Sequence, residues 1–301
     1  MNFLLTFVNY LILFNKTYQN PQDYERRETI FYENQRKIEY HNSRNYSYTY
    51  GYNNFTDHTF NEFKGKYLNY MYRPQEKERV RVSSQDRNTS VDWRSSGIVN
   101  HIKNQGQCGS CWAFSGVSAI ESMFAKRTGV LYDLSEQEMV DCVQDCSGCG
   151  GGWPTSVYKY VMENNITNES NYPYVESDGV CYTNQTKSLL RVRGYKVIMN
   201  NTRDVLNALY ELGPLSVALD AEDSFQMYSN GIYESEDCSN DPEDMDHAVM
   251  LVGYGIDNLS GKLYFILRNS WGTDWGVGGY MYFSGELSNM CGILNDVTIP
   301  Y

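Results

Sequence analysis

The chain has 301 residues, of which 41% are hydrophobic, and its formal net charge is −12. This length allows two compact units or one large one, with a sizeable core, and the hydrophobic content excludes a disordered chain. The acidic balance argues against a nucleic-acid partner, because binding to phosphates requires a basic surface. No apolar stretch reaches the length of a transmembrane helix, so we expect no membrane span.

The charge is divided unevenly along the chain. Residues 1–86 carry a net charge of +2, and residues 87–301 carry a net charge of −14. A slightly basic leading segment would be attracted to an acidic remainder, and this attraction would weaken as carboxylates become protonated.

Cysteines and glycosylation sequons both indicate an oxidising, secretory environment. Seven of the eight cysteines follow residue 110, and disulfides persist outside the cytosol. Nine Asn-x-Ser/Thr sequons agree with this, although an Asn-rich chain produces some by chance: they begin at Asn15, Asn45, Asn54, Asn88, Asn165, Asn168, Asn184, Asn200 and Asn258. The apolar residues 3–14 lack the basic start and the cleavage site of a signal peptide, so we expect an amphipathic helix there and a secretion signal missing from this sequence.

The first 63 residues have a helical pattern. Six residues recur at spacings of three or four and therefore share one helical face: Asp23, Arg27, Phe31, Asn34, Ile38 and Asn42. The following Gly51-Tyr-Asn-Asn-Phe-Thr-Asp57 predicts a turn and a short strand. Taken alone, this segment also fits an ordinary helical hairpin.

Residues 64–89 are polar and charged and lack apolar periodicity, which predicts an exposed linker that proteases would cut easily. We expect a processing boundary between Gln85 and Ser90, which divides the chain into residues 1–86 and 87–301.

The remainder changes from helical to strand-like patterns. Helices are expected over 112–126, 136–141 and 153–163, and a short one near 202–211, whereas strands are expected over 215–219, 247–253, 263–267 and 279–283. A helical half (about 97–200) followed by a β half (about 201–296) predicts an α+β fold of two lobes, with the active site in the cleft between them.

Cys111 lies where a helix is expected to begin, within Gln105-Gly-Gln-Cys-Gly-Ser-Cys-Trp-Ala-Phe-Ser115. Free backbone N–H groups at a helix start stabilise a thiolate, which is the nucleophilic form of cysteine. The amide of Gln105 could donate to negative charge developing on a substrate oxygen. The Cys108-x-x-Cys111 spacing leaves a redox dithiol or half of a zinc site as alternatives.

A cysteine nucleophile needs a base and a group that orients the base. Three of the four histidines precede the boundary or lie in a polar connector: His41, His58 and His101. His247 begins an expected buried strand and is the remaining candidate. Asn269, at the end of the next strand, could accept a hydrogen bond from the imidazole and fix its tautomer, with Trp271 shielding that bond from water.

These motifs resemble those of papain-family cysteine proteases. The sequence Cys-Gly-Ser-Cys-Trp ending at Trp112 matches the family's cysteine signature, and the segments around His247 and Asn269 resemble its histidine and asparagine motifs. The six-residue helical series and the Gly51–Asp57 segment resemble the two motifs of cathepsin L-type propeptides, although the series begins with Asp23 where the family has Glu. The resemblance covers about residues 3–301 and implies a cathepsin L-like zymogen with a papain-like fold: a helical prodomain, a helical lobe and a β-barrel-like lobe.

The resemblance also implies residue roles. Cys111 would be the nucleophile, His247 the general base and then acid, and Asn269 the orienting group, while Gln105 and the Cys111 N–H would form the oxyanion hole. The implied disulfides are Cys108–Cys149, Cys142–Cys181 and Cys238–Cys291, which leaves Cys111 free and Cys146 unassigned. No cofactor or metal is implied, and the spacing between Cys111 and Cys146 is too long for the usual four-cysteine zinc site.

Substrate would bind along the Gly-rich run before Trp153. Gly152 would pair with the second residue before the scissile bond, and the carbonyl of Asp246 would pair with the residue just before that bond. The implied binding set comprises Gly151, Gly152, Trp153, Pro154, Ala218, Met245, Asp246, Ala248, Trp271 and Asp296. Asp296 would lie at the base of the pocket and admit Arg or Lys as well as Leu or Phe, unless its carboxylate points to solvent. Gly150 stands where the family usually has Asn.

The sequence therefore predicts a monomeric cysteine endopeptidase that acts on polypeptides in a lysosome-like acidic compartment or after secretion. Residues 64–86 would pass through the cleft in a non-productive direction until acid releases them. Two alternatives stay open: a catalytically silent papain-fold binding protein, and a thiol–disulfide exchange protein that uses Cys108 and Cys111.

Overall fold

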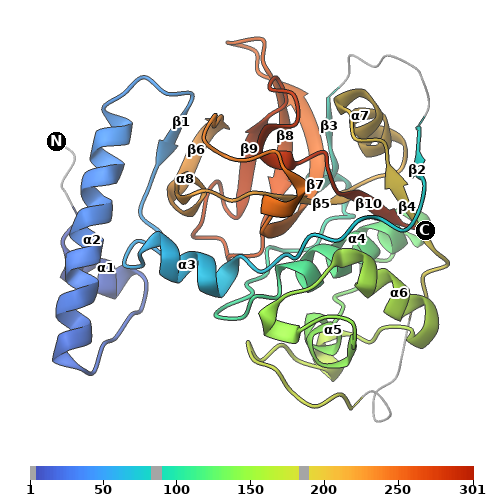
Figure 1. Cartoon of the computed structure of the whole chain (residues 1–301), viewed down its shortest axis with the longest axis horizontal. Helices are drawn as coiled ribbons and strands as arrows, with labels where there is room; N and C mark the ends of the chain where they lie inside the picture. The colour runs from blue at the N-terminus through green and yellow to red at the C-terminus, as the bar shows by residue number, and fades with distance from the viewer. Residues whose placement is uncertain (1–4, 83–89, 183–189) are drawn as a thin grey trace.

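The computed structural model describes residues 5–82, 90–182 and 190–301. A helical N-terminal segment lies along one side of a body made of two lobes, and an extended stretch of this segment crosses the body (Figure 1). We refer to residues 5–82 as the N-terminal segment and to residues 90–301 as the body. The processing boundary expected at residues 86–87 lies outside the described residues.

The N-terminal segment has its own small aromatic core. Helix α1 (Phe7–Leu13) packs on α2 (Pro21–Asn42) through Phe7, Tyr10 and Phe31, which are completely buried. The expected common face of α2 is buried at Phe31, Asn34 and Ile38. Strand β1 (Tyr48–Tyr50) and helix α3 (Phe60–Tyr67) follow, and α3 begins with a capping box formed by Thr59 and Glu62.

The residues after α3 form the exposed linker that their composition predicts only in part, since residues 71, 74, 76–78 and 81 are exposed but others are held by the body. Tyr67, Leu68 and Tyr70 are buried against the body. Strand β2 (Arg79–Val80) pairs in parallel with β4, and β1 pairs antiparallel with β6, so the N-terminal segment adds a strand to each end of the sheet. A polar stretch can be ordered in this way because the partner surface, rather than its own periodicity, supplies the contacts.

The helical lobe contains three main helices, which match the expected positions to within two residues: α4 (Cys111–Thr128), α5 (Glu136–Cys142) and α6 (Pro154–Asn164). Helix α4 is buried over most of its length and ends at Gly129, whose φ of 74° favours glycine. A capping box at the start of α5 is only half formed. Ser135 accepts from the Glu138 N–H, but the Glu138 carboxylate accepts from the Thr167 N–H at 2.8 Å instead.

The second lobe is built on one mixed sheet. Its expected members are found as α7 (Thr202–Glu211), β5 (Leu215–Leu219), β7 (His247–Ile256), β8 (Leu263–Arg268) and β9 (Tyr280–Ser284). The structure also contains elements that the sequence patterns did not predict: β3 (Val91–Asp92), β4 (Tyr195–Ile198), α8 (Asp223–Met227), β6 (Tyr228–Tyr233) and β10 (Val297–Pro300). The strand order is β1-β6-β9-β8-β7-β5-β10-β4-β2, with β3 paired to β7. Strand β4 belongs to this sheet, although its residues fall within the range expected for the helical lobe.

The described residues also form short 3₁₀ turns: η1 (Trp93–Ser96), η2 (Gly148–Gly150), η3 (Glu169–Asn171), η5 (Pro242–Asp244) and η6 (Met290–Gly292).

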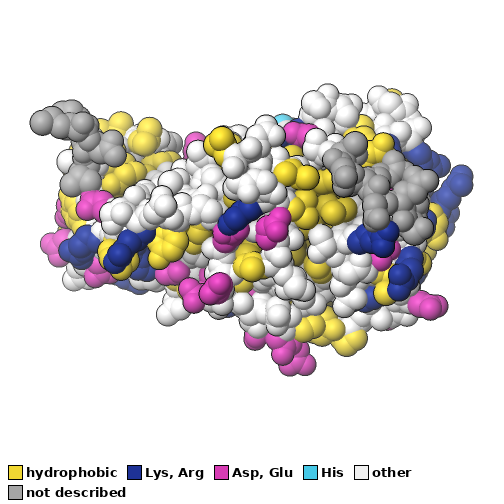
Figure 2. All heavy atoms as spheres, turned by 90° about the horizontal axis from the view of Figure 1, so that it is seen from above, with side chains coloured by type: hydrophobic (Ala, Val, Ile, Leu, Met, Phe, Trp, Pro, Cys, Tyr) yellow, Lys and Arg dark blue, Asp and Glu magenta, His cyan; other side chains and the backbone are white. Residues whose placement is uncertain are grey.

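The face of the molecule seen in Figure 2 carries basic and acidic side chains interspersed, with apolar side chains between them. Within the described ranges, no helix is both long enough and apolar enough to cross a membrane.

Helix α4 and strand β7 meet where the two lobes join. Ser115 of α4 donates a hydrogen bond to the carbonyl of Val249 at 2.7 Å, and Met250 and Val252 of β7 share a hydrophobic core with α4. This contact matters because α4 begins with Cys111 and β7 begins with His247. The fold therefore brings the starts of these two elements to one place.

Candidate active site

Cys111 is the first residue of α4 and is completely buried. Its thiol lies against the backbone of Ala248, the residue after His247, and against the backbone of Asn69 from the N-terminal segment. Burial raises the pKa of the Cys111 thiol to about 11, although backbone hydrogen bonds from Ala248, Asn69 and Trp112 act in the opposite direction. In this state the thiol is therefore protonated and poorly nucleophilic.

His247 lies at the start of β7, opposite Leu219 of β5. Its Nε2 is 2.9 Å from the side-chain oxygen of Asn269, and its ring stacks on Trp271 with 4.5 Å between centroids. Burial lowers the pKa of His247 to about 4, against the opposing effect of the Asn269 hydrogen bond. Nδ1 has no hydrogen-bond partner among the described residues. A neutral imidazole with a free Nδ1 beside the thiol-bearing helix is suited to take up a proton.

Asn269 follows the last residue of β8, and its side-chain oxygen also accepts a hydrogen bond from the Ser270 N–H at 2.8 Å. These two contacts hold the amide oxygen toward His247. Trp271 is 1% exposed, and Phe63 of the N-terminal segment packs edge-on against it at 5.0 Å. These contacts keep water away from the His247–Asn269 hydrogen bond. The lower dielectric of this dry environment strengthens the bond.

Gln105 is held in one orientation by two donors from the other lobe. Its side-chain oxygen accepts from the hydroxyl of Ser270 at 2.8 Å and from the indole N–H of Trp271 at 3.2 Å. Its Nε2 donates to the carbonyl oxygens of Cys108, at 3.0 Å, and of Tyr67, at 3.1 Å. The contact of Ser270 with Gln105 was not predicted from the sequence, although the position of Ser270 beside Asn269 could have indicated it.

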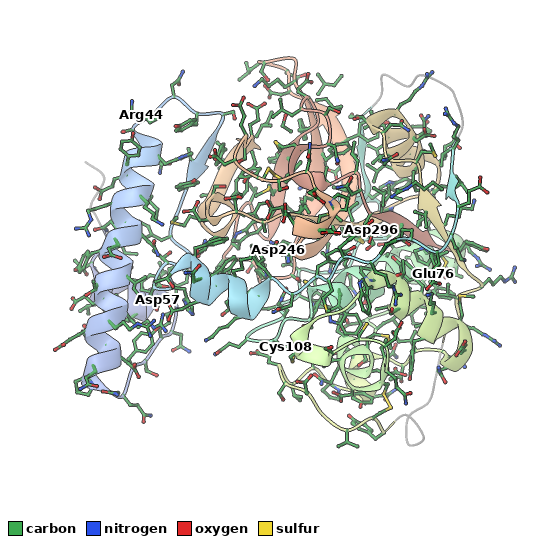
Figure 3. All side chains as sticks on the ribbon, in the orientation of Figure 1. Arg44, Asp57, Glu76, Cys108, Asp246 and Asp296 are labelled. Atoms are coloured by element: carbon green, nitrogen blue, oxygen red, sulfur yellow. A yellow bond between two sulfur atoms is a disulfide. The ribbon has the colours of Figure 1, made fainter. Side chains whose placement is uncertain are left out.

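The N-terminal segment occupies the backbone groups that were expected to bind substrate. Tyr70 donates its N–H to the carbonyl of Asp246 at 2.8 Å, and Gly152 donates its N–H to the carbonyl of Asn69 at 3.3 Å. Tyr70 and Gly152 form a parallel bridge. Figure 3 shows Asp246 and Asp296 on one side of this extended stretch and Cys108 on the other.

Gly151 permits the close approach of this stretch. Its φ is 121°, and a Cβ on it would lie 2.4 Å from the carbonyl oxygen of Asn69. Any residue with a side chain would therefore clash with the occupant of the cleft and would strain the backbone.

The side chain of Tyr70 fills an apolar pocket beside Cys111. The buried cluster around it contains Cys111, Ala218, Met245 and Ala248, with Trp153 packed against it. Pro154 begins α6 and is also buried. The pocket residues expected from sequence thus surround one tyrosine.

Asp296 lies at the base of this pocket and is 5% exposed, so its carboxylate does not point to solvent. The hydroxyl of Tyr70 donates to one carboxylate oxygen at 2.5 Å, and Gln75 donates to the other. Burial raises the pKa of Asp296 above its ordinary value, while the hydrogen bond from Tyr70 and the charge of Arg79 lower it. The pocket therefore joins apolar walls to a buried hydrogen-bond acceptor.

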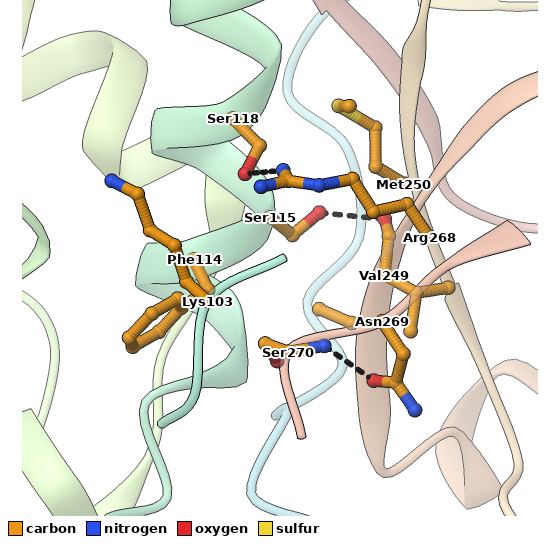
Figure 4. A pocket seen from close by; sticks show the side chains of 10 residues that line it. Lys103, Phe114, Ser115, Ser118, Val249, Met250, Arg268, Asn269 and Ser270 are labelled. Carbon is orange, nitrogen blue, oxygen red and sulfur yellow. Dashed lines mark hydrogen bonds between the residues drawn. The ribbon is translucent and has the colours of Figure 1, made fainter. Parts of the chain in front are cut away.

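A brace links the lobes behind these residues. Arg268 is 4% exposed and donates to the hydroxyl of Ser118 on α4 and, at 2.6 Å, to the carbonyl of His101. A small pocket of about 10 Å³ adjoins Arg268, Ser115 and Ser118 (Figure 4), which is room for about one water molecule. Because Arg268 precedes Asn269, this brace fixes the strand end that carries Asn269 relative to α4.

The disulfides join Cys108 to Cys149, Cys142 to Cys181, and Cys238 to Cys291. Cys111 and Cys146 are free. Cys108 therefore cannot act as a dithiol partner of Cys111 while it is bonded to Cys149. The described residues contain no group of three or more His, Cys, Asp or Glu side chains arranged to hold a metal ion.

Comparisons with known proteins match both parts of the chain. The family model "Papain family cysteine protease" matches residues 87–301, and the model "Cathepsin propeptide inhibitor domain" matches residues 7–63. Cathepsin K of Mus musculus is 44% identical over 214 residues, which is 70% of this chain and 64% of that protein. A cathepsin L-like proteinase of Fasciola hepatica is 39% identical over 253 residues, covering 82% of this chain and 76% of that one. The chain thus spans slightly less than two thirds of the length of its cathepsin K relative.

Solved structures of precursors are similar over almost the whole chain. Digestive procathepsin L 3 from the larval midgut of Tenebrio molitor superimposes with a TM-score of 0.89 at 35% identity, covering 97% of both chains. The precursor of recombinant stem bromelain also gives a TM-score of 0.89 at 35% identity, covering 98% of this chain and 97% of that one. The arrangement of the N-terminal segment on the body is therefore shared with these precursors.

Proposed function

The chain belongs to the papain family of cysteine proteases, and from this membership we propose that it is a cysteine endopeptidase held inactive by its own propeptide. The observation that carries the proposal is the occupied cleft. Residues 69 and 70 use the backbone groups of Gly152 and Asp246, and the carbonyl of Tyr67 uses the side-chain donor of Gln105. We propose residues 1–86 as the propeptide and residues 87–301 as the peptidase domain.

Removal of the propeptide would start the chemistry by changing two pKa values. Asn69 and Tyr70 contribute to the burial of Cys111, and Phe63 contributes to the burial of Trp271, which shields the His247–Asn269 hydrogen bond. Water would therefore enter the site when these residues leave. The pKa of His247 would then rise and the pKa of Cys111 would fall, because both shifts originate in burial. The proton would pass from the thiol to the free Nδ1 of His247 and leave a thiolate–imidazolium pair.

The thiolate of Cys111 would attack the carbonyl carbon of the scissile peptide bond. Negative charge would develop on the carbonyl oxygen and would be met by the N–H of Cys111 and by Nε2 of Gln105. His247 would give its proton to the leaving amine, and a thioester would form. His247 would then take a proton from water, and the hydroxide would attack the carbonyl carbon of the thioester. The acyl group would leave as a carboxylic acid, and the sulfur of Cys111 would be restored with its proton on His247. Asn269 holds the ring in the required orientation throughout.

The pocket around Tyr70 supports a preference at the second residue before the scissile bond. Ala218, Met245 and Trp153 suit an apolar side chain such as Leu or Phe. The buried carboxylate of Asp296 now accepts a hydrogen bond from the hydroxyl of Tyr70, and it would equally accept one from the cationic end of Arg or Lys.

We further propose that the protein acts as a monomer on polypeptides in an acidic compartment or after secretion. The contacts between its basic propeptide and acidic body support acid release. The Cys108–Cys149 bond disfavours the thiol–disulfide exchange alternative.

The proposal is tested with the full chain brought to acidic pH. Wild type should lose about 86 residues and gain activity on fluorogenic peptides, whereas Cys111→Ala should do neither. Cys146→Ser is the matched control, because it removes the other free thiol and should leave both processes intact. Processing and peptide cleavage by Cys111→Ala at the wild-type rate would contradict the proposal.

A further inference from the structure

Arg73 of the propeptide is bound by the body at a point beyond the Tyr70 pocket. Its guanidinium lies over the ring of Trp153, 4.2 Å from the centroid. One of its terminal nitrogens is 3.3 Å from a carboxylate oxygen of Asp145, and the other donates to the hydroxyl of Ser156 at 3.3 Å. The guanidinium thus meets an aromatic face, a carboxylate and a hydroxyl at once.

The receiving groups are organised by the body itself. Ser156 is 1% exposed and donates its own hydroxyl proton to the carboxylate of Asp145 at 3.0 Å. Its backbone N–H is bonded to the carbonyl of Trp153, which precedes α6. None of these contacts involves the propeptide, so the site persists when Arg73 leaves.

The chemistry of the site favours arginine. A planar guanidinium can stack on an indole and, in the same pose, donate to two acceptors in its plane. Lysine offers a single point of charge and would satisfy only part of this arrangement. The net charge of −14 on residues 87–301 would also attract a cationic substrate.

We propose that Asp145, Trp153 and Ser156 form an outer subsite of the mature enzyme that binds an arginine side chain of the substrate. This inference rests on the proposed function. Arg73 lies three residues beyond Tyr70, which is bridged to Gly152. A substrate would follow the same groove in the opposite chain direction, with its second residue before the scissile bond beside Gly152. Because the Arg73 guanidinium lies over Trp153, the residue that follows Gly152, the arginine side chain would come from the third or fourth residue before that bond.

This subsite is distinct from the pocket closed by Asp296. Asp296 binds the hydroxyl of Tyr70 and the amide of Gln75, whereas Arg73 is paired with Asp145. Two separate carboxylates would thus act on two separate substrate positions, and substitutions can tell them apart.

The test uses the enzyme obtained by acid activation of the full chain. Peptides keep Leu as the second residue before the scissile bond and carry either arginine or citrulline, its uncharged isostere, as the third or the fourth. Wild type should cleave the arginine peptide with a kcat/KM about three- to tenfold higher at one of these positions. In Asp145→Asn this ratio should fall toward one.

Glu236→Gln is the matched control. It removes the same charge from the body, but it lies beside Tyr48 and His41, where β1 and α2 meet the second lobe. It should keep the wild-type ratio. Asp296→Asn should likewise keep the ratio while it changes the preference at the second residue.

Two results would overturn the subsite alone: equal cleavage of arginine and citrulline peptides by wild type at both positions, or an unchanged ratio in Asp145→Asn. Failure of the activated wild type to cleave any of the peptides would instead overturn the proposed function, and the subsite with it. The comparison of arginine with citrulline in wild type needs no substitution, so it stands even if a variant fails to fold.

Discussion

Nε2 of Gln105 donates a hydrogen bond to the carbonyl oxygen of Tyr67 at 3.1 Å. In the proposed mechanism the same nitrogen stabilises the oxyanion of the reacting substrate. The propeptide therefore occupies this donor with a carbonyl group. Its peptide bonds are not positioned for attack by Cys111, because the bridge between Tyr70 and Gly152 is parallel. The propeptide and the substrate would therefore contact the same groups of the cleft, but with opposite chain directions.

Substitution of Gln105 tests this shared donor. Gln105→Ala should lower the kcat of the activated enzyme about 100- to 1,000-fold, because it removes one oxyanion-hole donor from the transition state. Steady-state cleavage of a fluorogenic peptide measures the change. Gln107→Ala is the control, since Gln107 is exposed and its side chain contacts Lys66 of the propeptide. A loss of less than threefold in Gln105→Ala would contradict the assigned role.

The hydrogen bond between His247 and Asn269 should act on catalysis more than on binding. Asn269→Ala should lower kcat about tenfold with little change in KM, because it removes one shielded hydrogen bond that orients the imidazole. Asn258→Ala, on the exposed turn between β7 and β8, is the control. An increase in KM alone would show that Asn269 acts through substrate binding instead.

Asp296 should determine charge preference at the second residue before the scissile bond. Asp296→Ala should lower kcat/KM for Arg at this position about tenfold relative to Leu, because the buried carboxylate is the acceptor at the pocket base. Paired peptides that differ only at this residue measure the ratio. Equal losses on the Arg and Leu peptides would remove this role.

His58 should contribute to release of the propeptide by acid. Burial lowers the pKa of His58 below its ordinary value of 6.5, although the adjacent Asp57 raises it. Below pH 6.5 the released, unfolded propeptide therefore binds more protons than the folded one. The bound state loses stability as the pH falls from 6.5 through the lowered pKa.

His58→Gln should therefore move the midpoint of processing to lower pH, by about 0.5 pH unit. Gel analysis of processing across a pH series measures the midpoint. His101→Gln is the control, because His101 is exposed and lies in the body. A midpoint that moves to higher pH in His58→Gln would contradict the sign of this effect.

The sequence predicted the α+β two-lobe fold, which the similar precursor structures confirm, because long periodic segments such as α4 and β7 carry their own pattern. Strands β4 and β10 were missed because each has only four residues, and β6 was missed because its sequence Tyr-Ser-Asn-Gly-Ile-Tyr contains an Asn-Gly pair, which is typical of a turn. The binding mode of Tyr70 and Arg73 was also beyond prediction from residue patterns. Each is a single side chain in a polar stretch, and its role depends on which part of the body lies opposite.

The cluster of buried charges around Lys103 could not be predicted from the sequence either. Lys103 contacts Glu121, Asp133 and Glu136, which are distant along the chain, and these ion pairs raise the pKa of the lysine despite its burial. Neither periodicity nor a motif marks such a cluster. It becomes visible only when α4, α5 and the loop before Cys111 are packed together.

The central claim is that Cys111 becomes a thiolate when the propeptide leaves, and its alkylation rate tests this most directly. Iodoacetamide should modify Cys111 slowly in the unprocessed chain kept at pH 7, where burial raises the thiol pKa to about 11, and at least 100-fold faster in the enzyme that has been activated by acid and returned to pH 7. Mass spectrometry of the Cys146→Ser variant assigns the modified residue. Equal rates before and after activation, or a fast rate in His247→Ala whose propeptide has been removed by added wild-type enzyme, would contradict the account.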